Sequence, residues 1–194
     1  MKRLAVVKLG GGLARAPGAL ARASAAIEKA AQRKRLLIIP GGGVLADAVR
    51  LAERELGLTP TAVHWMAILA MDQFAYAIAS AIPGSRVVHD AAEIQNALAD
   101  SVVPVLAPYR WMLAADVLPH GWHATSDSIA AFIAGALDAE CLVLLKPVSG
   151  PVEALVDPCF RDVLPVGLTV LVLGAEEIER LPRILQESRS KAVD

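Results

Sequence analysis

Two glycine clusters, each placed directly after a short apolar run, are the first candidates for chemistry in this sequence. The run Leu4–Leu9 is followed by glycines at 10–12, and the run Leu36–Ile39 by Pro-Gly-Gly-Gly at 40–43. Glycines let a backbone approach a phosphate closely and turn successive N–H groups toward it. The helical spacing of apolar residues over 44–56 adds the positive end of a helix dipole after the second cluster. Two phosphate-binding loops, one for a donor and one for an acceptor, are the functional interpretation, and ordinary strand-to-helix turns are the alternative.

Two lysines stand at the ends of apolar runs. Lys8 precedes the first glycine cluster, and Lys146 follows the uniformly apolar run Cys141–Leu145. A lysine at such a place is costly unless its ammonium meets a partner, and a phosphate is a suitable one. In phosphoryl transfer the protein mainly positions groups and neutralises charge on the phosphoryl oxygens. Both lysines suit that role, whereas a side chain that extends to solvent at the edge of a sheet is the alternative.

The segment Thr125-Ser126-Asp127-Ser128 precedes another apolar helical run. Thr125 or Ser126 can cap that helix, and Asp127 is an ordinary acidic residue for its first turn. From spacing alone, a helix start explains the segment. If it faces the glycine clusters, however, the carboxylate can also orient lysines or hold a metal. The dipeptide Asp157-Pro158 indicates a turn, which can form a loop at the nucleotide.

The histidines show no metal-ligand spacing, so we predict no metal site built from them. His64 lies in an apolar stretch where core packing is the default, and a place in the wall of an acceptor pocket is the alternative. Several common motifs are absent. There is no GxxxxGK(S/T) loop and no GxSxG, and the third glycine of a GxGxxG pattern is replaced by Arg15. The sequence therefore favours neither a P-loop, nor a Rossmann dinucleotide site, nor an acyl-transfer enzyme.

Apolar runs alternate with helical patterns along the chain. Besides the two runs above, strands are expected at 86–88, 102–107, 141–145 and 169–173, and helices at 19–32, 44–56, 60–82, 91–99, 109–115, 126–137 and 176–186. The strands are continuous apolar runs, which is typical of a mostly parallel sheet covered by helices on both faces. We expect one α/β domain over 1–187 and a polar tail at 188–194. Ligands of such sheets bind at the carboxyl ends of the strands, where the glycines and both lysines lie.

Composition excludes further classes of protein. The 194 residues carry 19 Lys and Arg against 20 Asp and Glu, whereas nucleic-acid-binding proteins usually have a basic excess. Cys141 and Cys159 have no CxxC spacing and fit free thiols in a reducing compartment. The stretch Thr59–Ser85 is the most membrane-like, but Asp72 within it favours a buried core helix. We expect a cytoplasmic protein with no nucleic-acid or membrane partner, and its large apolar excess predicts a homo-oligomer.

The order of the motifs resembles that of the amino acid kinase superfamily, which includes acetylglutamate, aspartate and uridylate kinases. The resemblance rests on KLGGG at 8–12, PGGG at 40–43, SDSIA at 126–130 and LLKPVSG at 144–150. It implies a three-layer α/β/α sandwich and transfer of the γ-phosphoryl group of ATP, with Mg²⁺, to a carboxylate, carbamate or phosphate acceptor. It also implies that Lys8 stabilises the transferring group and that Asp127 organises the catalytic lysines.

These arguments together predict a site with three sets of residues. The catalytic set is Lys8, Asp127 and Lys146. The nucleotide- and phosphate-binding set is Gly10, Gly11, Gly12, Pro147, Val148, Gly150 and Asp157. The acceptor-binding set is Gly41, Gly42, Gly43, His64 and Ser126.

The sequence departs from the superfamily pattern at two places. A GG-M-x-x-K stretch near the C-terminus, whose lysine contacts the ATP phosphates, has no match here. The nucleotide segment, which usually reads T-D-V-x-G, is replaced by the residues of 146–150. We hypothesise that Lys146 supplies the missing second positive charge.

The short chain and the segments 64–73 and 122–129 most resemble a small branch of the superfamily that acts in methanofuran-type cofactor synthesis, within one-carbon metabolism. Enzymes of that branch convert an (aminomethylfuranyl)methyl phosphate into a diphosphate. Two alternatives remain open. One is a catalytically silent protein of the same fold that binds a nucleotide or oxyanion. The other is a kinase for a carboxylate, with Arg50 or Arg86 as the residue that binds it.

Overall fold

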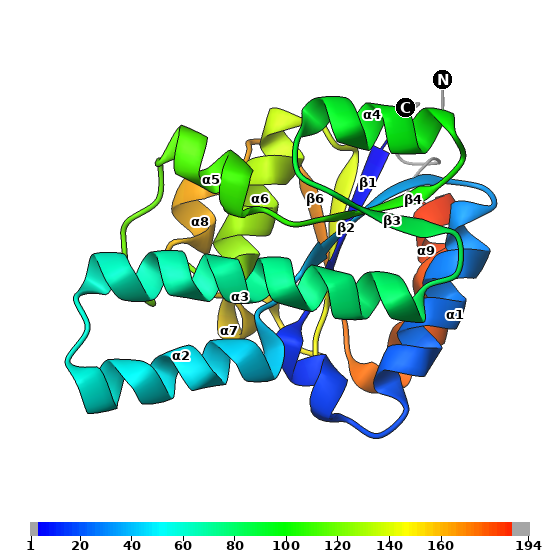
Figure 1. Cartoon of the computed structure of the whole chain (residues 1–194). Coiled ribbons are helices and arrows are strands. Elements are labelled where there is room, and N and C mark those ends of the chain that lie inside the picture. The colour runs from blue at the N-terminus through cyan, green and yellow to red at the C-terminus, as the bar shows by residue number, and fades with distance from the viewer. Residues whose placement is uncertain (1–3, 188–194) are drawn as a thin grey trace.

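One six-stranded sheet, covered by helices on both faces, organises residues 4–187, which are the residues that the computed structural model describes (Figure 1). Its strands are β1 (Leu4–Leu9), β2 (Arg35–Pro40), β3 (Ser85–Val88), β4 (Val103–Leu106), β5 (Cys141–Leu145) and β6 (Thr169–Leu173). They lie in the order β3-β4-β2-β1-β5-β6, and all neighbouring pairs are parallel. The predicted α/β fold is confirmed. The tail predicted at 188–194 lies outside the described residues.

The helices follow the predicted order, with differences at short elements. They are α1 (Ala19–Ala31), α2 (Gly43–Leu56), α3 (Pro60–Ala81), α4 (Ala91–Ala99), α5 (Tyr109–Ala115), α6 (Ser126–Ala136), α7 (Val152–Leu155), α8 (Phe160–Val163) and α9 (Leu181–Glu187), with the 3-10 helices η1 (Gly11–Arg15) and η2 (Ala175–Arg180). The sequence analysis missed η1, α7 and α8, because a single turn has no apolar period to detect. It also predicted one helix at 176–186, where the structure has η2 followed by α9.

The apolar strands are buried on both faces because successive side chains of a strand point in opposite directions. Ala5 and Val7 of β1 belong to a core cluster that includes side chains of α1, α9 and the C-terminal half of α3. Leu4 and Val6 belong to a second cluster, with side chains of α4, α5 and α6. This packing explains why the strands read as uninterrupted apolar runs.

Among the described helices, α3 alone is long and apolar enough to cross a membrane by length and composition. In its apolar stretch of 18 residues, 44% is buried inside the protein. Ile68, Phe74 and Ile78 of α3 are buried in the two clusters that flank the sheet. The Thr59 hydroxyl accepts a hydrogen bond from the Ala62 N–H and caps the helix. In the structure α3 therefore packs as a core helix, as the sequence analysis expected.

The strand order places β1 between β2 and β5. Strands β2, β4 and β3 therefore lie on one side of β1, and β5 and β6 lie on the other. Leu9 at the end of β1 is in register with Pro40 of β2 and Leu145 of β5. Both glycine clusters and Lys146 consequently meet at one edge of the sheet. Such a point, where the strand order changes direction, is the usual place of a ligand in an open parallel sheet.

The opposite edge of the sheet holds a buried ion pair. Lys34 precedes β2 and Glu140 precedes β5, and Lys34 Nζ lies 2.5 Å from Glu140 Oε2 with both side chains 10% exposed or less. We expect Lys34→Met to lower the free energy of unfolding by about 3 kcal/mol, because it leaves the carboxylate buried without its partner. Urea unfolding measures the change, with Lys29→Met on the exposed face of α1 as the control. Equal unfolding midpoints for the two variants would contradict the expectation.

Candidate active site

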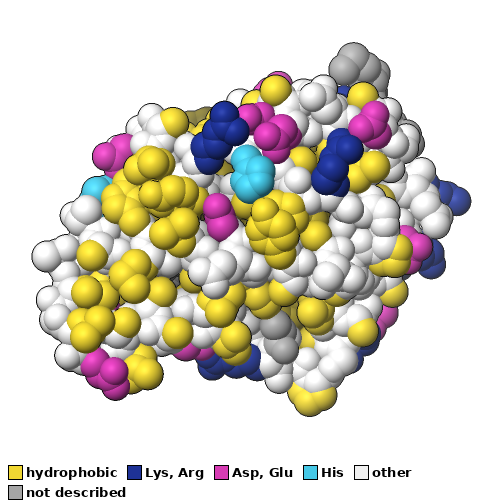
Figure 2. All heavy atoms as spheres, viewed as in Figure 1, with side chains coloured by type: hydrophobic (Ala, Val, Ile, Leu, Met, Phe, Trp, Pro, Cys, Tyr) yellow, Lys and Arg dark blue, Asp and Glu magenta, His cyan; other side chains and the backbone are white. Residues whose placement is uncertain are grey.

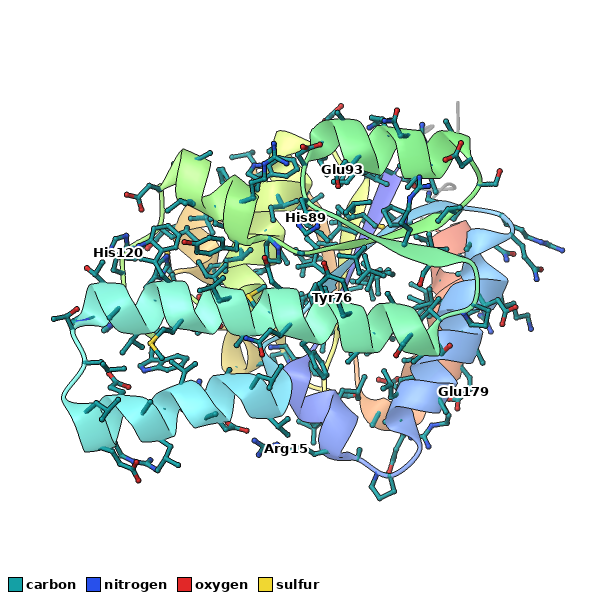
Figure 3. The ribbon with its side chains drawn as sticks, viewed as in Figure 1. Arg15, Tyr76, His89, Glu93, His120 and Glu179 are labelled. Carbon is teal, nitrogen blue, oxygen red and sulfur yellow. The ribbon has the colours of Figure 1, made fainter. Side chains whose placement is uncertain are left out.

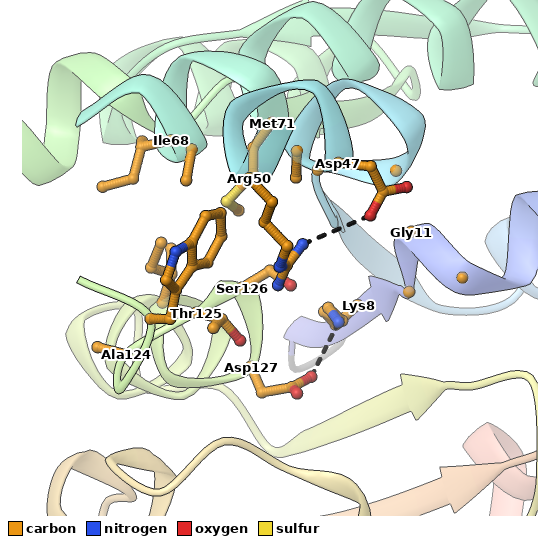
Figure 4. A pocket seen from close by; sticks show the side chains of 18 of the residues that line it. Lys8, Gly11, Asp47, Arg50, Ile68, Met71, Ala124, Thr125, Ser126 and Asp127 are labelled. Atoms are coloured by element: carbon orange, nitrogen blue, oxygen red, sulfur yellow. Dashed lines mark ion pairs between the residues drawn. The ribbon is translucent and has the colours of Figure 1, made fainter. Parts of the chain in front are cut away.

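A cavity of about 320 Å³ opens at the carboxyl edge of the sheet (Figure 4). Its walls come from the ends of β1, β2 and β5, from η1, α2, α3 and α6, and from the connection between α5 and α6. Its volume is that of a small-molecule site. The predicted site residues that line it are Lys8, Gly10, Gly11, Gly12, Gly42, Gly43, His64, Ser126, Asp127, Lys146 and Pro147.

A buried carboxylate between two ammonium groups lies at the base of this cavity. Lys8 Nζ is 2.9 Å from Asp127 Oδ1, and Lys146 Nζ is 2.6 Å from Asp127 Oδ2. Lys146 Nζ also donates a hydrogen bond to the Leu155 carbonyl at 2.7 Å. The three charged residues are each at most 9% exposed. One carboxylate thus fixes both lysines, and the group as a whole keeps a positive charge.

Burial and mutual charge shift the pKa values of this group. Burial alone would raise the pKa of the Asp127 carboxyl, but the charges of Lys8 and Lys146 outweigh it and hold that pKa below its usual range. Burial lowers the pKa of the Lys146 ammonium, and the charge of Lys8 lowers it further, against the opposing effect of Asp127. Asp127 is therefore ionised at neutral pH, and Lys146 loses its proton at a lower pH than an ordinary lysine does.

The start of α6 sets the position of Asp127, and a distant carboxylate holds that start. Asp157 Oδ2 accepts hydrogen bonds from the N–H groups of Thr125 and Ser128 at 3.0 and 3.1 Å. The same carboxylate accepts hydrogen bonds from both hydroxyls. Thr125 is the N-cap residue, as one of the two predicted alternatives has it, but its side chain makes no capping hydrogen bond. Asp157 takes that role instead, and it is not among the residues that line the cavity.

We expect Asp157→Ala to lower the free energy of unfolding by about 2 kcal/mol, because it leaves the N–H groups of Thr125 and Ser128 without an acceptor. Since α6 carries Asp127, the same change should also lower turnover. Thermal unfolding and steady-state turnover measure the two effects. Asp162→Ala, which removes an exposed acid from α8, is the matched control. A variant as stable and as active as this control would contradict the assignment.

The two glycine clusters touch each other. The Gly10 N–H donates to the Leu145 carbonyl at 2.9 Å, and the Gly41 N–H donates to the Leu9 carbonyl at 2.8 Å, so these two glycines tie the loops to the sheet. A Cβ atom on Gly11 would lie 2.2 Å from the Gly43 nitrogen, and one on Gly41 would lie 2.4 Å from the Gly11 nitrogen. Only residues without side chains allow this approach. The loops therefore form one continuous backbone surface beside Lys8.

Four predicted residues lie away from the cavity lining. Gly41 is buried behind it, and Asp157 caps α6. Val148 is 59% exposed, and Gly150 packs near Leu155. Of the predicted nucleotide segment, Lys146 and Pro147 reach the cavity.

His64 lines the cavity from α3. Its imidazole is 3% exposed and stacks on that of His120, with ring centroids 4.6 Å apart. His120 lies at the amino-terminal end of α3 (Figure 3), where its ring nitrogens contact Thr61 and Asp116. Burial lowers the pKa of His64, and the neighbouring His120 lowers it further. His64 is therefore neutral at physiological pH and can donate or accept one hydrogen bond in the cavity wall.

The sequence analysis missed Arg15, Asp47 and Trp122 of the cavity wall, and it named Thr125, which also lines the cavity, only as a helix cap. It named Arg50 and Arg86 as alternatives for binding a carboxylate. Arg50 lines the cavity, whereas Arg86 lies on β3 and pairs with Asp100, away from it. The sequence did contain an indication of Asp47 and Arg50, because they lie about one helical turn apart on the helix that follows the second glycine cluster.

Comparison with known proteins adds evidence on family and fold. Residues 3–150 match the amino acid kinase family. A protein of Methanocaldococcus jannaschii named (5-(aminomethyl)furan-3-yl)methyl phosphate kinase is 27% identical over 181 residues, which cover 92% of this chain and 78% of that protein. Uridylate kinase from Archaeoglobus fulgidus has a TM-score of 0.65 at 19% identity, over 93% of this chain and 95% of that chain. UMP kinase from Ureaplasma parvum has a TM-score of 0.70 at 16% identity, over 97% and 96%. At such identities, the two solved structures establish a shared fold.

Proposed function

Because the chain belongs to the amino acid kinase family and is a phosphotransferase, we propose that it transfers the γ-phosphoryl group of ATP to the phosphate of a small acceptor. The proposed acceptor is (5-(aminomethyl)furan-3-yl)methyl phosphate, and the product is the corresponding diphosphate. One observation carries the proposal. Two buried ammonium groups flank Asp127 where the two glycine loops meet, and this is a site for polyanions.

Lys8 and Lys146 neutralise the charge on the transferring phosphoryl oxygens. Among the described residues Lys8 has Asp127 as its ion-pair partner, so it retains N–H donors for a phosphoryl group. Lys146 donates to Asp127 and Leu155 and retains one N–H. Since the acceptor phosphate is already ionised, the reaction needs no general base. Positioning and electrostatic stabilisation then account for catalysis.

The loops suit the phosphates of ATP. Gly11, Gly12 and the start of α2 at Gly43 offer backbone N–H groups and a helix dipole to anions. The described residues contain no group of three or more His, Cys, Asp or Glu side chains placed to hold a metal ion. Mg²⁺ commonly binds to substrate phosphates with few protein ligands, so it fits this site as part of Mg-ATP. Bound there, Mg²⁺ supplies charge neutralisation at the phosphate oxygens.

The acceptor assignment rests on the relative from Methanocaldococcus jannaschii and on the cavity wall. That relative is named for the same acceptor. In this chain Ile68 and Met71 of α3 give the cavity an apolar side suited to a small ring, and His64 and Ser126 add polar groups. A carboxylate acceptor is the second candidate, because Arg50 in the same wall can bind either anion.

The test is ADP production from Mg-ATP by the purified protein with each of a panel of acceptors. The panel contains the furan phosphate, its free alcohol, UMP, and amino acids with and without an N-acetyl group. We expect ADP release that depends on the furan phosphate and is absent with the alcohol. Release with an amino acid would replace the proposed acceptor by a carboxylate. ATP binding without turnover for any acceptor would instead support the alternative of a catalytically silent binding protein of the same fold.

We also propose that the protein is a cytoplasmic homo-oligomer. Several apolar side chains of α2 and α3 are exposed, among them Val44, Leu51 and Tyr76 at 59%, 47% and 59%. Figure 2 shows hydrophobic side chains spread over this face of the molecule. Light scattering on the purified protein measures its mass in solution. A monomer of 20.4 kDa would contradict the proposal.

A further inference from the structure

Helix α2 presents a row of charged residues beside the cavity. Asp47, Arg50 and Glu53 follow one another at intervals of three residues and therefore share one side of the helix. Asp47 and Arg50 line the cavity, and Trp122 from the connection between α5 and α6 lines it as well. The proposed mechanism, which uses the lysines and the glycine loops, gives no role to Glu53 or Trp122 and names Arg50 only as a group that can bind an anion.

Trp122 is held in place by its two neighbours on α2. Its Nε1–H donates a hydrogen bond to Glu53 Oε2 at 2.7 Å. The Cζ atom of Arg50 lies 3.9 Å from the centroid of the Trp122 ring, within the range of a cation–π contact. The indole also packs against the small apolar cluster around Val49 and Val63, between α2 and α3. The hydrogen bond fixes the rotation of the indole, and the indole supports one face of the guanidinium.

This arrangement keeps the charge of Arg50 available to a ligand. Glu53 lies three residues from Arg50 on the same helix, a spacing at which oppositely charged side chains commonly form an ion pair. In the structure the Glu53 carboxylate binds the indole N–H instead. Among residues 4–187 Arg50 pairs with Asp47, at 3.5 Å from Arg50 Nη1, and Asp47 is shared with Arg15. The guanidinium is thus oriented by an uncharged ring and only partly neutralised.

The cavity lining carries more positive charge than Lys8, Lys146 and Asp127 contribute. Its lining contains four cations, Lys8, Lys146, Arg15 and Arg50, against the two carboxylates of Asp127 and Asp47. Figure 4 shows Arg50 reaching from α2 toward Ser126, with the pair of Lys8 and Asp127 below it in this view. A second anionic group therefore finds a cation on α2 in addition to the two lysines.

We propose that Arg50 binds the phosphate of the acceptor, and that Trp122 and Glu53 are positioning residues that hold the guanidinium toward it. This inference rests on the proposed function and names the specificity-determining residue of the same site. Arginine suits a phosphate because its planar guanidinium donates two parallel hydrogen bonds. One acceptor oxygen then faces the γ-phosphorus atom of ATP while others are bound by Arg50. An acceptor that lacks the phosphate loses this contact.

The experiment compares steady-state kinetics of Arg50→Lys, Arg50→Met, Trp122→Phe and Glu53→Ala with those of the wild type. We expect Arg50→Lys to raise the KM for the furan phosphate about tenfold, because lysine keeps the charge but not the paired geometry. We expect about a hundredfold for Arg50→Met and a smaller rise for Trp122→Phe and Glu53→Ala. The KM for ATP should stay within about twofold in all four.

Arg54→Met is the matched control, because Arg54 lies one turn further along α2, is exposed and does not line the cavity. Thermal unfolding of every variant separates a lost contact from a lost fold. In the Trp122 and Glu53 variants, a merely structural role would lower stability and affect both KM values equally, and that result would overturn the positioning role. An unchanged KM for the furan phosphate in Arg50→Met would overturn the role of Arg50.

Calorimetric binding of benzyl phosphate, with benzyl alcohol as the neutral probe, separates this inference from the proposed function. Binding of benzyl phosphate that Arg50→Met abolishes would support the inference, even if the wild type makes no ADP with the furan phosphate. That second result would overturn the proposed acceptor alone. A wild type that binds benzyl phosphate no better than benzyl alcohol, or equally well after Arg50→Met, would overturn the inference.

Discussion

Replacement of Lys8 by methionine should lower kcat by about a hundredfold or more, while the protein stays folded. The reason is that Lys8, of the two buried lysines in the cavity, retains more unused N–H donors, and removal of one preorganised donor to a developing charge has effects of this size. Methionine fills nearly the same volume, so the buried space next to Asp127 remains occupied. Turnover at saturating Mg-ATP and acceptor measures the effect.

Two controls make the Lys8 result specific. Lys29→Met removes an exposed lysine from α1 and should leave turnover unchanged. Thermal unfolding of Lys8→Met tests whether the fold persists, because Asp127 keeps Lys146 as a partner after the substitution. A folded Lys8→Met protein with wild-type turnover would contradict the assignment of Lys8 as a catalytic residue.

Lys146→Met should reduce kcat by a similar factor. This prediction tests the hypothesis that Lys146 takes the place of the lysine of the missing GG-M-x-x-K stretch. The position of Lys146 is consistent with this hypothesis, since Lys146 follows β5 and shares Asp127 with Lys8 in the cavity. If the Lys146 variant turns over as fast as the wild type, the second positive charge must come from elsewhere.

The dependence of kcat on pH gives an independent measurement of the same residue. Burial and the charge of Lys8 lower the pKa of Lys146, so the ammonium loses its proton, and turnover falls, at a lower pH than for an exposed lysine. Lys146→Arg keeps its charge and should extend the activity that remains to higher pH. On the acid side, the lowered pKa of Asp127 keeps this carboxylate ionised well below neutrality. An alkaline limb that is identical in wild type and Lys146→Arg would assign that limb to another group.

The sequence by itself determined the fold class, the strand positions and most of the centre of the candidate site. The physical reason is local. Apolar runs of strand length with intervening helical patterns favour a parallel sheet, and in such a sheet all carboxyl ends meet at one edge. Residues at or just beyond the carboxyl ends of strands, such as Lys8, Gly11 and Lys146, are therefore brought together by topology alone. Asp127 needed the superfamily resemblance as well, because a first-turn acid of a helix has an ordinary explanation.

Only the tertiary structure decided which side chains hold these residues in place. Asp157 caps α6 from 29 residues away in sequence, and Glu53 binds Trp122 from 69 residues away. Neither pair belongs to a periodic pattern, since each joins a loop to a helix that packs beside it only in the folded chain. Hydrogen bonds and ion pairs depend on such distances and orientations, which the order of residues along a strand or helix does not specify.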